Sequence, residues 1–136
     1  MLEGRARRFR DEIYASHSGD GTMNMFPQRA VRDLRYKYIL NLHPERTWTT
    51  HFTKVDGHPD SHKQVWDSWV ERAKSDPAAA RTVALIETHP REELYDTLAD
   101  PHELTNLAAE PRHRATLERL RARLAARRRE LGDQDE

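Results

Sequence analysis

Hydrophobic and polar positions alternate along three short stretches of the chain, as they do in half-buried β-strands. Residues 11–18 form the first stretch. Between residues 29 and 42, aromatic and β-branched side chains alternate with basic ones, which predicts a hairpin that turns near Asp33. Pro44 ends this hairpin because proline has no backbone N–H to donate to a strand ladder. The third strand is predicted at residues 93–97.

The chain between the hairpin and the last strand follows a different pattern. Residues 44–60 contain two prolines and a glycine and are interpreted as irregular. A helix is then predicted to begin at Asp60 or Ser61, either of which can cap it, and to carry a hydrophobic stripe. The stripe consists of Val65, Trp66, Trp69 and Val70. We interpret both tryptophans as core residues rather than as a stacking platform for a ligand.

Two more helices are predicted in the second half of the chain. Asp76 has the character of an N-cap and is followed by Pro77 at the first helical position, so a helix is expected to continue to about Glu87. The final helix lies within residues 111–131, with leucines on one face and arginines over the rest. The leucines are Leu117, Leu120, Leu124 and Leu131. This order of elements predicts an α+β fold.

The Asp-Pro-His-Glu sequence that starts at Asp100 has the spacing of a capping box. In that motif Asp100 accepts an N–H at the helix start, Pro101 fills the first position and Glu103 reaches back. We therefore assign these residues a structural role, because both carboxylates would be engaged by the backbone. Leu94 is assigned to the sheet and Leu107 to the core.

The composition is that of a polar chain with balanced charges. Its 136 residues are 36% hydrophobic and 34% charged, and the mean hydropathy is −0.99, which suits one domain with a modest core. Lys plus Arg and Asp plus Glu both number 23, so no net field favours nucleic acid or an anionic membrane, and neither is expected as a partner. The absence of cysteine excludes disulfides, thiolate metal sites and a cysteine nucleophile. No signal-peptide pattern or membrane-length hydrophobic run is present, so the chain as written is expected to be soluble and cytoplasmic.

Eight histidines invite a test for metal binding. His58 and His62 are four residues apart, but Pro59 and a preceding glycine place His58 outside any helix, and no metal-binding motif is present. We therefore expect no metal site. His17 differs from the others because it stands at the end of a predicted strand, just before a glycine-containing loop, where binding groups are often placed.

The predicted final helix is strongly basic, with eight arginines between residues 112 and 129. Such a helix can bind phosphate or sulfate groups, so one alternative function is a free-standing interaction module for an anionic glycan or nucleic acid. The competing interpretation is a solvated helix face whose arginine stems cover the leucines. Acidic residues at the end of the chain weaken the positive field and favour the second interpretation.

Residues 93–124 resemble the C-terminal signature of the sulfatase family, in which an E-L-Y-D-L strand is followed by D-P-x-E-x-x-N-L-A and a final helix. The matching residues are Glu93-Leu94-Tyr95-Asp96, Leu98, Asp100-Pro101, Glu103, Asn106-Leu107-Ala108, Pro111 and the leucines at 117, 120 and 124. Residues 25–42 resemble the R-x-V-R-x-x-x-Y-K-Y-I hairpin of sulfatases and, with His17 before them, are most similar to the heparan N-sulfatase (sulfamidase) branch. Residues 2–15 resemble the stretch that leaves the catalytic domain, whereas residues 44–90 match poorly.

The resemblance implies only a C-terminal portion of such an enzyme, namely a small antiparallel β-sheet with a long C-terminal helix packed across it. Sulfatases carry a large α/β domain with a calcium ion and a C/S-x-P-S/A-x-R motif, whose Cys or Ser becomes formylglycine. The near match at residues 75–78 is rejected because Arg81 stands two positions too late. Residues 1–18 are then expected to be the end of the catalytic domain or a linker, and residues 19–136 the C-terminal subdomain. Calcium and formylglycine are expected only in the missing catalytic domain, and the chain alone is expected to be inactive.

The resemblance also implies where substrate would bind. In the family this portion closes one side of the active-site cleft and helps to select the sugar, which makes His17 and Arg29 the substrate-binding candidates. Arginine can bind a carboxylate or sulfate in a bidentate manner, and histidine can bond a sugar hydroxyl or a sulfamate. The expected partners are a sulfated sugar and a catalytic domain on the same or a separate chain. A gene remnant with no independent role is the remaining alternative.

Overall fold

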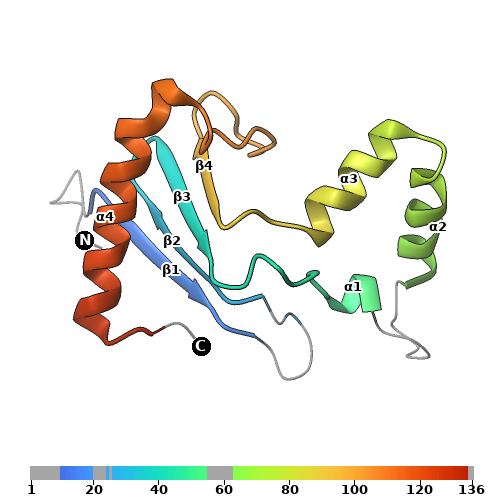
Figure 1. Cartoon of the computed structure of the whole chain (residues 1–136), viewed down its shortest axis with the longest axis horizontal. Coiled ribbons are helices and arrows are strands. Elements are labelled where there is room, and N and C mark those ends of the chain that lie inside the picture. The colour runs from blue at the N-terminus through green and yellow to red at the C-terminus, as the bar shows by residue number, and fades with distance from the viewer. Residues whose placement is uncertain (1–9, 20–23, 25, 55–62, 135–136) are drawn as a thin grey trace, which may run out of the picture. The chain divides into compact units, whose positions relative to one another are not determined.

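The chain combines a β-sheet with several helices (Figure 1). A computed structural model describes residues 10–19, 24, 26–54 and 63–134. The strands are β1 (Ile13–His17), β2 (Gln28–Arg32), β3 (Tyr36–Asn41) and β4 (Glu92–Asp96). The α-helices are α1 (His51–Lys54), α2 (Lys63–Ala73), α3 (Pro77–Glu87) and α4 (Arg114–Leu131), and a 3-10 turn (Pro111–His113) precedes α4. The α+β class expected from the sequence is confirmed.

The four strands form one antiparallel sheet in the order β1-β2-β3-β4, and α4 packs across one of its faces (Figure 1). β4 pairs with β3 so that Tyr38 stands opposite Leu94. These two side chains, with Val31 of β2, form a core cluster with the buried leucines of the helix. The helix contributes Leu117, Leu120 and Leu124, and Leu107 joins them from the preceding loop. Leu131, which the sequence pattern groups with them, is 64% exposed and lies outside this core.

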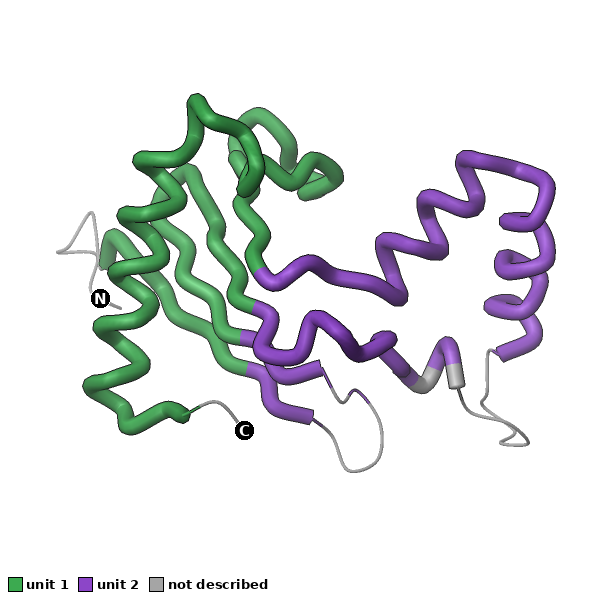
Figure 2. Tube along the Cα trace, viewed as in Figure 1, with its two compact units in different colours: residues 1–16, 29–40, 92–136 green, residues 17–28, 41–91 purple. Residues whose placement is uncertain are grey.

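The chain divides into two compact units (Figure 2). Unit 1 comprises residues 1–16, 29–40 and 92–136, and unit 2 comprises residues 17–28 and 41–91. Unit 1 contains the core cluster under α4, and unit 2 contains helices α1 to α3. The predicted domain boundary at residue 18 stays a prediction.

The turn between β2 and β3 has a local chemical cause. The Asp33 carboxylate accepts hydrogen bonds from the backbone N–H groups of Arg35 (2.8 Å) and Tyr36 (2.7 Å). This is an Asx-type turn, in which a short side chain takes the place of a backbone acceptor. The predicted position of the hairpin turn is confirmed.

Helix α3 begins as its sequence predicts. The Asp76 carboxylate accepts from the N–H groups of Ala78 and Ala79, and Pro77 occupies the first helical position. Helix α2 confirms the predicted helix around Trp66, although the proposed caps at Asp60 and Ser61 lie outside the described residues.

The hydrophobic stripe of α2 is only partly buried. Trp66 is 3% exposed, whereas Trp69 is 41% exposed, so the assignment of both tryptophans to the core was right for Trp66 alone. Both rings contact Phe52, with centroids 5.6 Å away in each case. Phe52 belongs to α1, a short helix within the segment that the sequence predicted to be irregular.

The predicted capping box at Asp100 is wrong. Residues 100–110 contain no helix, and α4 begins only at Arg114. The Asp100 carboxylate instead accepts from the backbone N–H of Thr105 (2.8 Å) and closes a loop. Glu103 has a φ of 55°, in the left-handed region that a helix cannot use, and its carboxylate pairs with Lys37. Glu103 thus pairs with Lys37 of β3 and does not reach back to a helix start.

No helix in the described part of the chain has both the length and the hydrophobic character needed to cross a membrane.

Gly132 ends α4 and provides a test of local backbone strain. Its φ of 65° is left-handed, and its N–H donates to the last turn of the helix. Gly132→Ala is expected to lower the free energy of unfolding by about 1 kcal/mol, because L-residues other than Asn and Asp disfavour this conformation. A Cβ at this position would meet no atom within 4 Å, so the cost is purely conformational. Urea denaturation followed by circular dichroism measures the loss, and an equal loss in Gly132→Asn would contradict this explanation.

Candidate functional site

His17, the first candidate residue, ends β1 and has a fixed orientation. Its Nε2 atom lies 2.9 Å from the backbone carbonyl oxygen of Asn24. A carbonyl oxygen only accepts hydrogen bonds, so Nε2 must carry the hydrogen. In the neutral ring Nδ1 is therefore the acceptor nitrogen.

The His17 ring also belongs to a column of four stacked rings in unit 2. The His17 ring stacks on Phe26 with centroids 4.6 Å apart, Phe26 stacks on Trp48 at 4.2 Å, and Trp48 stacks on His89 at 3.5 Å. Stacked rings of this kind add to the stabilisation that burial provides. The column therefore fixes the plane of the His17 imidazole.

Backbone hydrogen bonds hold together the segments that carry these rings. Asn24 donates to Thr49 (2.9 Å), and Trp48 donates to Glu87 (2.8 Å). The loop before β2 is thus joined to the segment after β3, and that segment is joined to the end of α3. The position of His17 depends on all three segments.

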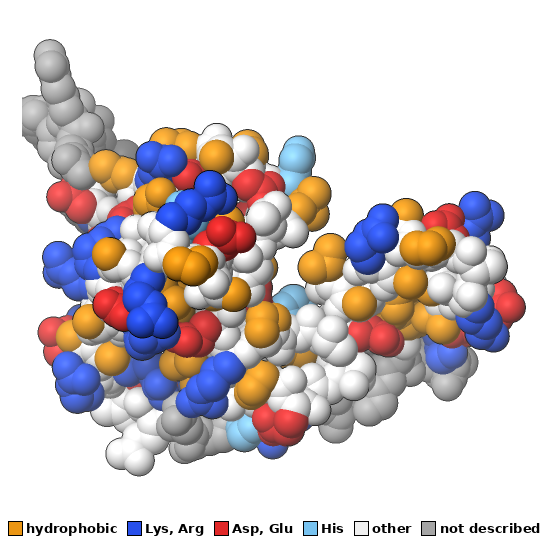
Figure 3. All heavy atoms as spheres, turned by 45° about the horizontal axis from the view of Figure 1, so that its top comes forward, with side chains coloured by type: hydrophobic (Ala, Val, Ile, Leu, Met, Phe, Trp, Pro, Cys, Tyr) orange, Lys and Arg blue, Asp and Glu red, His pale blue; other side chains and the backbone are white. Residues whose placement is uncertain are grey.

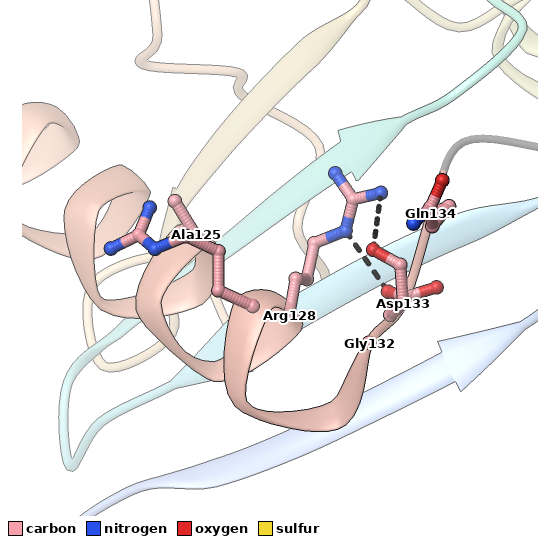
Figure 4. Close-up of a pocket in the computed structure, with 6 residues that line it drawn as sticks. Ala125, Arg128, Gly132, Asp133 and Gln134 are labelled. Atoms are coloured by element: carbon pink, nitrogen blue, oxygen red, sulfur yellow. Dashed lines mark hydrogen bonds and ion pairs between the residues drawn. The ribbon is translucent and has the colours of Figure 1, made fainter.

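Arg29, the second candidate, lies on β2 and is only 9% exposed. Its guanidinium donates from Nε and Nη2 to the two carboxylate oxygens of Asp133, each at 2.7 Å. Arg128, on α4, donates from Nε to the same carboxylate at 2.9 Å (Figure 4). Two guanidinium groups from different elements therefore converge on one carboxylate just after the end of the helix.

This ion pairing sets the charge state of Asp133. The hydrogen bond from Arg29, followed by that from Arg128, lowers the pKa of the Asp133 carboxyl from 3.8 to about 2, against the opposing effect of burial. The side chain is thus ionised throughout the neutral range. Asp133 provides Arg29 with the bidentate carboxylate partner that the sequence analysis assigned to a substrate.

An open pocket of about 310 Å³ lies beside this ion pair, between β1 and α4. Its lining includes Tyr14, Ser16, Arg29, Arg127 and Asp133. The Arg127 guanidinium lies 5.8 Å from the centre of the Tyr14 ring. The Arg127 guanidinium thus faces an aromatic ring, and the Arg29 guanidinium faces a carboxylate. Both groups already have a partner within this chain.

The arginines of the last helix are largely neutralised by nearby carboxylates. Across the helix surface, Arg119 pairs with Asp33 (2.7 Å), Arg121 with Glu92 (2.7 Å) and Arg123 with Glu12 (3.5 Å). Three more pairs lie at its two ends, namely Arg112–Glu110, Arg127–Glu130 and Arg128–Asp133. Figure 3 accordingly shows Lys and Arg side chains interleaved with Asp and Glu on the face that it presents. This arrangement favours the interpretation of the helix as a neutralised, sheet-bound element over that of an anion-binding surface.

One of these pairs continues into the core. The Glu92 carboxylate accepts from Arg121 and also from the Tyr38 hydroxyl (2.6 Å). Burial, and then the hydrogen bond to Glu92, raises the pKa of Tyr38 well above its usual value. Tyr38 is thus a permanently neutral core donor and carries no acid–base chemistry at physiological pH.

No group of three or more His, Asp or Glu side chains suited to holding a metal ion occurs among the residues that the structure describes. The His58–His62 pair lies outside those residues.

The two candidates lie in different units, and each has its own partners. The sequence analysis missed Asp133, which is 104 residues from Arg29 along the chain. It also missed Phe26, Trp48 and His89, because aromatic residues in irregular segments produce no periodic pattern.

Comparison with known proteins gives consistent matches. No family model matches the chain. An ulvan-active sulfatase of Formosa agariphila is 30% identical over 122 residues, which are 88% of this chain and 21% of that protein. A second ulvan-active sulfatase of the same organism is 32% identical over 96 residues, which are 71% of this chain and 15% of that protein. The chain therefore spans only about a fifth of the length of the first relative and less of the second.

The fold is also similar to a solved structure. A protein of Bacteroides thetaiotaomicron assigned as a sulfatase matches with a TM-score of 0.52 and 22% sequence identity. The match covers 95% of this chain and 18% of that protein. Nearly all of the present fold thus recurs as a small part of a much larger protein.

Proposed function

We propose that this chain is the C-terminal portion of a sulfatase that hydrolyses the sulfate ester or sulfamate of a sulfated sugar. The observation that carries the proposal is the match of 88% of the chain to 21% of an ulvan-active sulfatase. The sheet with its long C-terminal helix agrees with the portion that follows the catalytic domain. The chain by itself is then inactive, and the formylglycine and calcium of the reaction belong to the catalytic part.

Within such an enzyme, this portion positions groups that contact the sugar. His17 suits this role because its ring plane is fixed by stacking and its Nε2 hydrogen is committed to Asn24. Arg29 is the second proposed contact. Since its guanidinium is bound to Asp133, an anionic group of the substrate would have to share or replace that carboxylate.

The bond that is cleaved can be either a sulfamate or a sulfate ester. Residues 25–42 favour the heparan N-sulfatase branch and hence a sulfamate, whereas the two similar proteins are named for ulvan. Sulfate release from an N-sulfated and from an O-sulfated sugar, compared in one assay, decides between the two.

A chimeric enzyme tests the proposed function. In the first Formosa agariphila ulvan-active sulfatase, the region matched by this chain is replaced by residues 1–136; we call this protein the chimera. The chimera is expected to release sulfate from ulvan, whereas the same sulfatase without the matched region is expected to release none. A folded chimera that lacks sulfatase activity would contradict the proposed function.

The two proposed substrate contacts are tested in the active chimera. His17→Ala is expected to lower kcat/KM at least about ten-fold, which corresponds to roughly 1.4 kcal/mol, the loss of one hydrogen bond to substrate. Arg29→Ala is expected to have a similar effect, but this change also breaks the pair with Asp133. Asp133→Asn is its matched control, because it weakens the same pair and keeps the guanidinium. Equal kcat/KM values in Arg29→Ala and Asp133→Asn would reduce Arg29 to a structural role.

A further inference from the structure

Helices α2 and α3, which pack against each other within unit 2, border a predominantly apolar pocket of about 270 Å³. Its lining includes Trp69 and Arg72 of α2 and Ala79 and Thr82 of α3. Because the two α3 side chains are small, they leave space beside the large indole. The volume is just below the range of about 300–1,000 Å³ that is typical of sites for drug-sized ligands, so the pocket suits a single small ring.

Trp69 gives this pocket an aromatic wall in a fixed orientation. The residue is 41% exposed. Its ring centroid lies 5.6 Å from that of Phe52 and 6.3 Å from that of Trp66, with interplanar angles of 74° and 48°. Neither neighbour is therefore stacked face to face on the indole, in contrast to the rings on either side of Trp48. The indole is held by its neighbours, yet no parallel ring lies against it in the described part of the chain.

Arg72 adds positive charge to the wall of the pocket. Its Nε donates to the Asp76 carboxylate at 3.1 Å, and its side chain is 71% exposed. The same carboxylate also caps α3 by accepting from Ala78 and Ala79. A guanidinium has five N–H donors, and no other hydrogen bond of the Arg72 guanidinium is found among the described residues. Its terminal amino groups are therefore left to bind an anionic group such as a sulfate.

We infer that this pocket binds one sugar ring of a sulfated glycan, with Trp69 stacked on the ring and Arg72 paired with its sulfate. The C–H faces of a pyranose ring are apolar and pack on an indole, while the hydroxyl groups at the ring edge stay in water. The choice of a sulfated sugar rests on the proposed function, and the pocket adds a binding site to the two contacts proposed above.

The size of the pocket favours a sugar ring over a protein partner. Two other exposed hydrophobic residues of these helices, Val65 and Leu85, do not line the pocket. A stable protein interface needs about 800 Å² on each partner, far more than a pocket of this size offers.

Binding of N-sulfated glucosamine to the isolated chain tests this site. Proton–nitrogen correlation NMR follows the indole N–H of Trp69 and the Nε–H of Arg72 during the titration. We expect both signals to shift to saturation, with a weak Kd of about 1–10 mM, as suits a single ring. N-acetylglucosamine, which has no sulfate, and inorganic sulfate, which has no ring, are each expected to bind at least about ten-fold more weakly. Absence of saturable binding of N-sulfated glucosamine, or equally tight binding of inorganic sulfate, would overturn the inference.

Thr82→Leu fills the pocket from α3 and leaves the ring contacts of Trp69 in place. Thr82 is exposed, and leucine has the higher helix propensity, so the variant is expected to fold. Its larger side chain occupies the space of the sugar and is expected to weaken binding of N-sulfated glucosamine at least about ten-fold. Unchanged affinity in the folded variant would overturn the site.

Arg72→Gln tests the sulfate contact, with Arg81→Gln as its matched control. Arg81 is exposed on α3 and does not line the pocket. Arg72→Gln is expected to remove the preference for N-sulfated glucosamine over N-acetylglucosamine, whereas Arg81→Gln is expected to keep it. Equal preferences in the two variants would overturn the pairing of Arg72 with the sulfate.

The chimera keeps this inference separate from the proposed function. Binding by the isolated chain together with a folded, inactive chimera would support the sugar site and contradict the function. An active chimera together with no binding by the isolated chain would do the reverse. Self-association of the isolated chain that Thr82→Leu abolishes would assign the pocket to a second copy of the chain and overturn the inference.

Discussion

Leu120→Ala is expected to lower the free energy of unfolding by about 2–5 kcal/mol, the largest effect of any single change considered in this chain. Leu120 is fully buried at the centre of the contact between α4 and the sheet, in one cluster with Tyr38 and Leu94. Removing three carbon atoms from this position eliminates their burial and leaves a cavity that the surrounding side chains fill only partly. A small domain is stable by about 5–15 kcal/mol, so the loss is a large fraction of the total. Urea denaturation followed by circular dichroism measures it.

Leu131→Ala is the control for this prediction. The residue type and the helix are the same, but Leu131 is largely exposed, so the expected change is within about 0.5 kcal/mol. Both substitutions replace leucine by alanine in the same helix, so intrinsic helix propensity does not separate them. Equal losses in the two variants would show that α4 is not held to the sheet by its buried leucines.

Elements that depend on local patterns could be predicted from the sequence. The hairpin at Asp33, the start of α3 at Asp76 and the leucine face of α4 each depend on residues only a few positions apart. Chemistry at this range is the same in most proteins, so the pattern determines the structure. The α+β class followed because these elements allow few ways to bury their hydrophobic faces together.

The capping box at Asp100 shows where local patterns are insufficient. The same Asp-Pro-x-Glu sequence can cap a helix or close a turn, since in both cases an aspartate carboxylate accepts a nearby backbone N–H. Here the turn forms, and Glu103 pairs with Lys37 instead of reaching back to a helix start. Lys37 is 66 residues earlier in the chain, and its position beside Glu103 exists only once β3 has paired with β4.

The candidate site could be predicted only in part for the same reason. His17 was identified from its position at a strand end, and Arg29 from its position in a family motif. The partners that fix them come from distant segments, Asp133 for Arg29 and the rings of Trp48 and His89 for the column that holds His17. No periodicity or motif links these positions. The hypothesis of an anion-binding helix illustrates the same difficulty, because the carboxylates that neutralise its arginines belong mainly to other elements.

Asp133→Asn is expected to lower the free energy of unfolding at neutral pH by about 2–3 kcal/mol. The substitution keeps the shape of the side chain but leaves the guanidinium groups of Arg29 and Arg128 without their carboxylate, at positions where both are largely buried. Asp67→Asn is the control, because Asp67 forms an exposed pair with Lys63 on α2 and is expected to matter by less than about 0.5 kcal/mol. If the two variants lost the same free energy of unfolding, the Asp133 pair would stabilise the chain no more than an exposed surface ion pair does.

The difference between the wild-type chain and Asp133→Asn is expected to depend on pH in a defined direction. The pKa of Asp133 is about 2 in the folded chain and about 3.9 when unfolded, so its ionised form is stabilised by folding. This contribution is fully present above the unfolded pKa and disappears as the pH falls towards the folded one. Asp96, whose pKa the hydrogen bond from Arg35 also lowers to about 2, titrates in the same window in both proteins, and its effect cancels in the comparison. Urea titrations at about pH 7, 5 and 3 should therefore show a constant difference at the two higher values and a smaller one at the lowest. A difference that stays the same at the lowest pH would mean that the charge of Asp133 does not stabilise the end of α4.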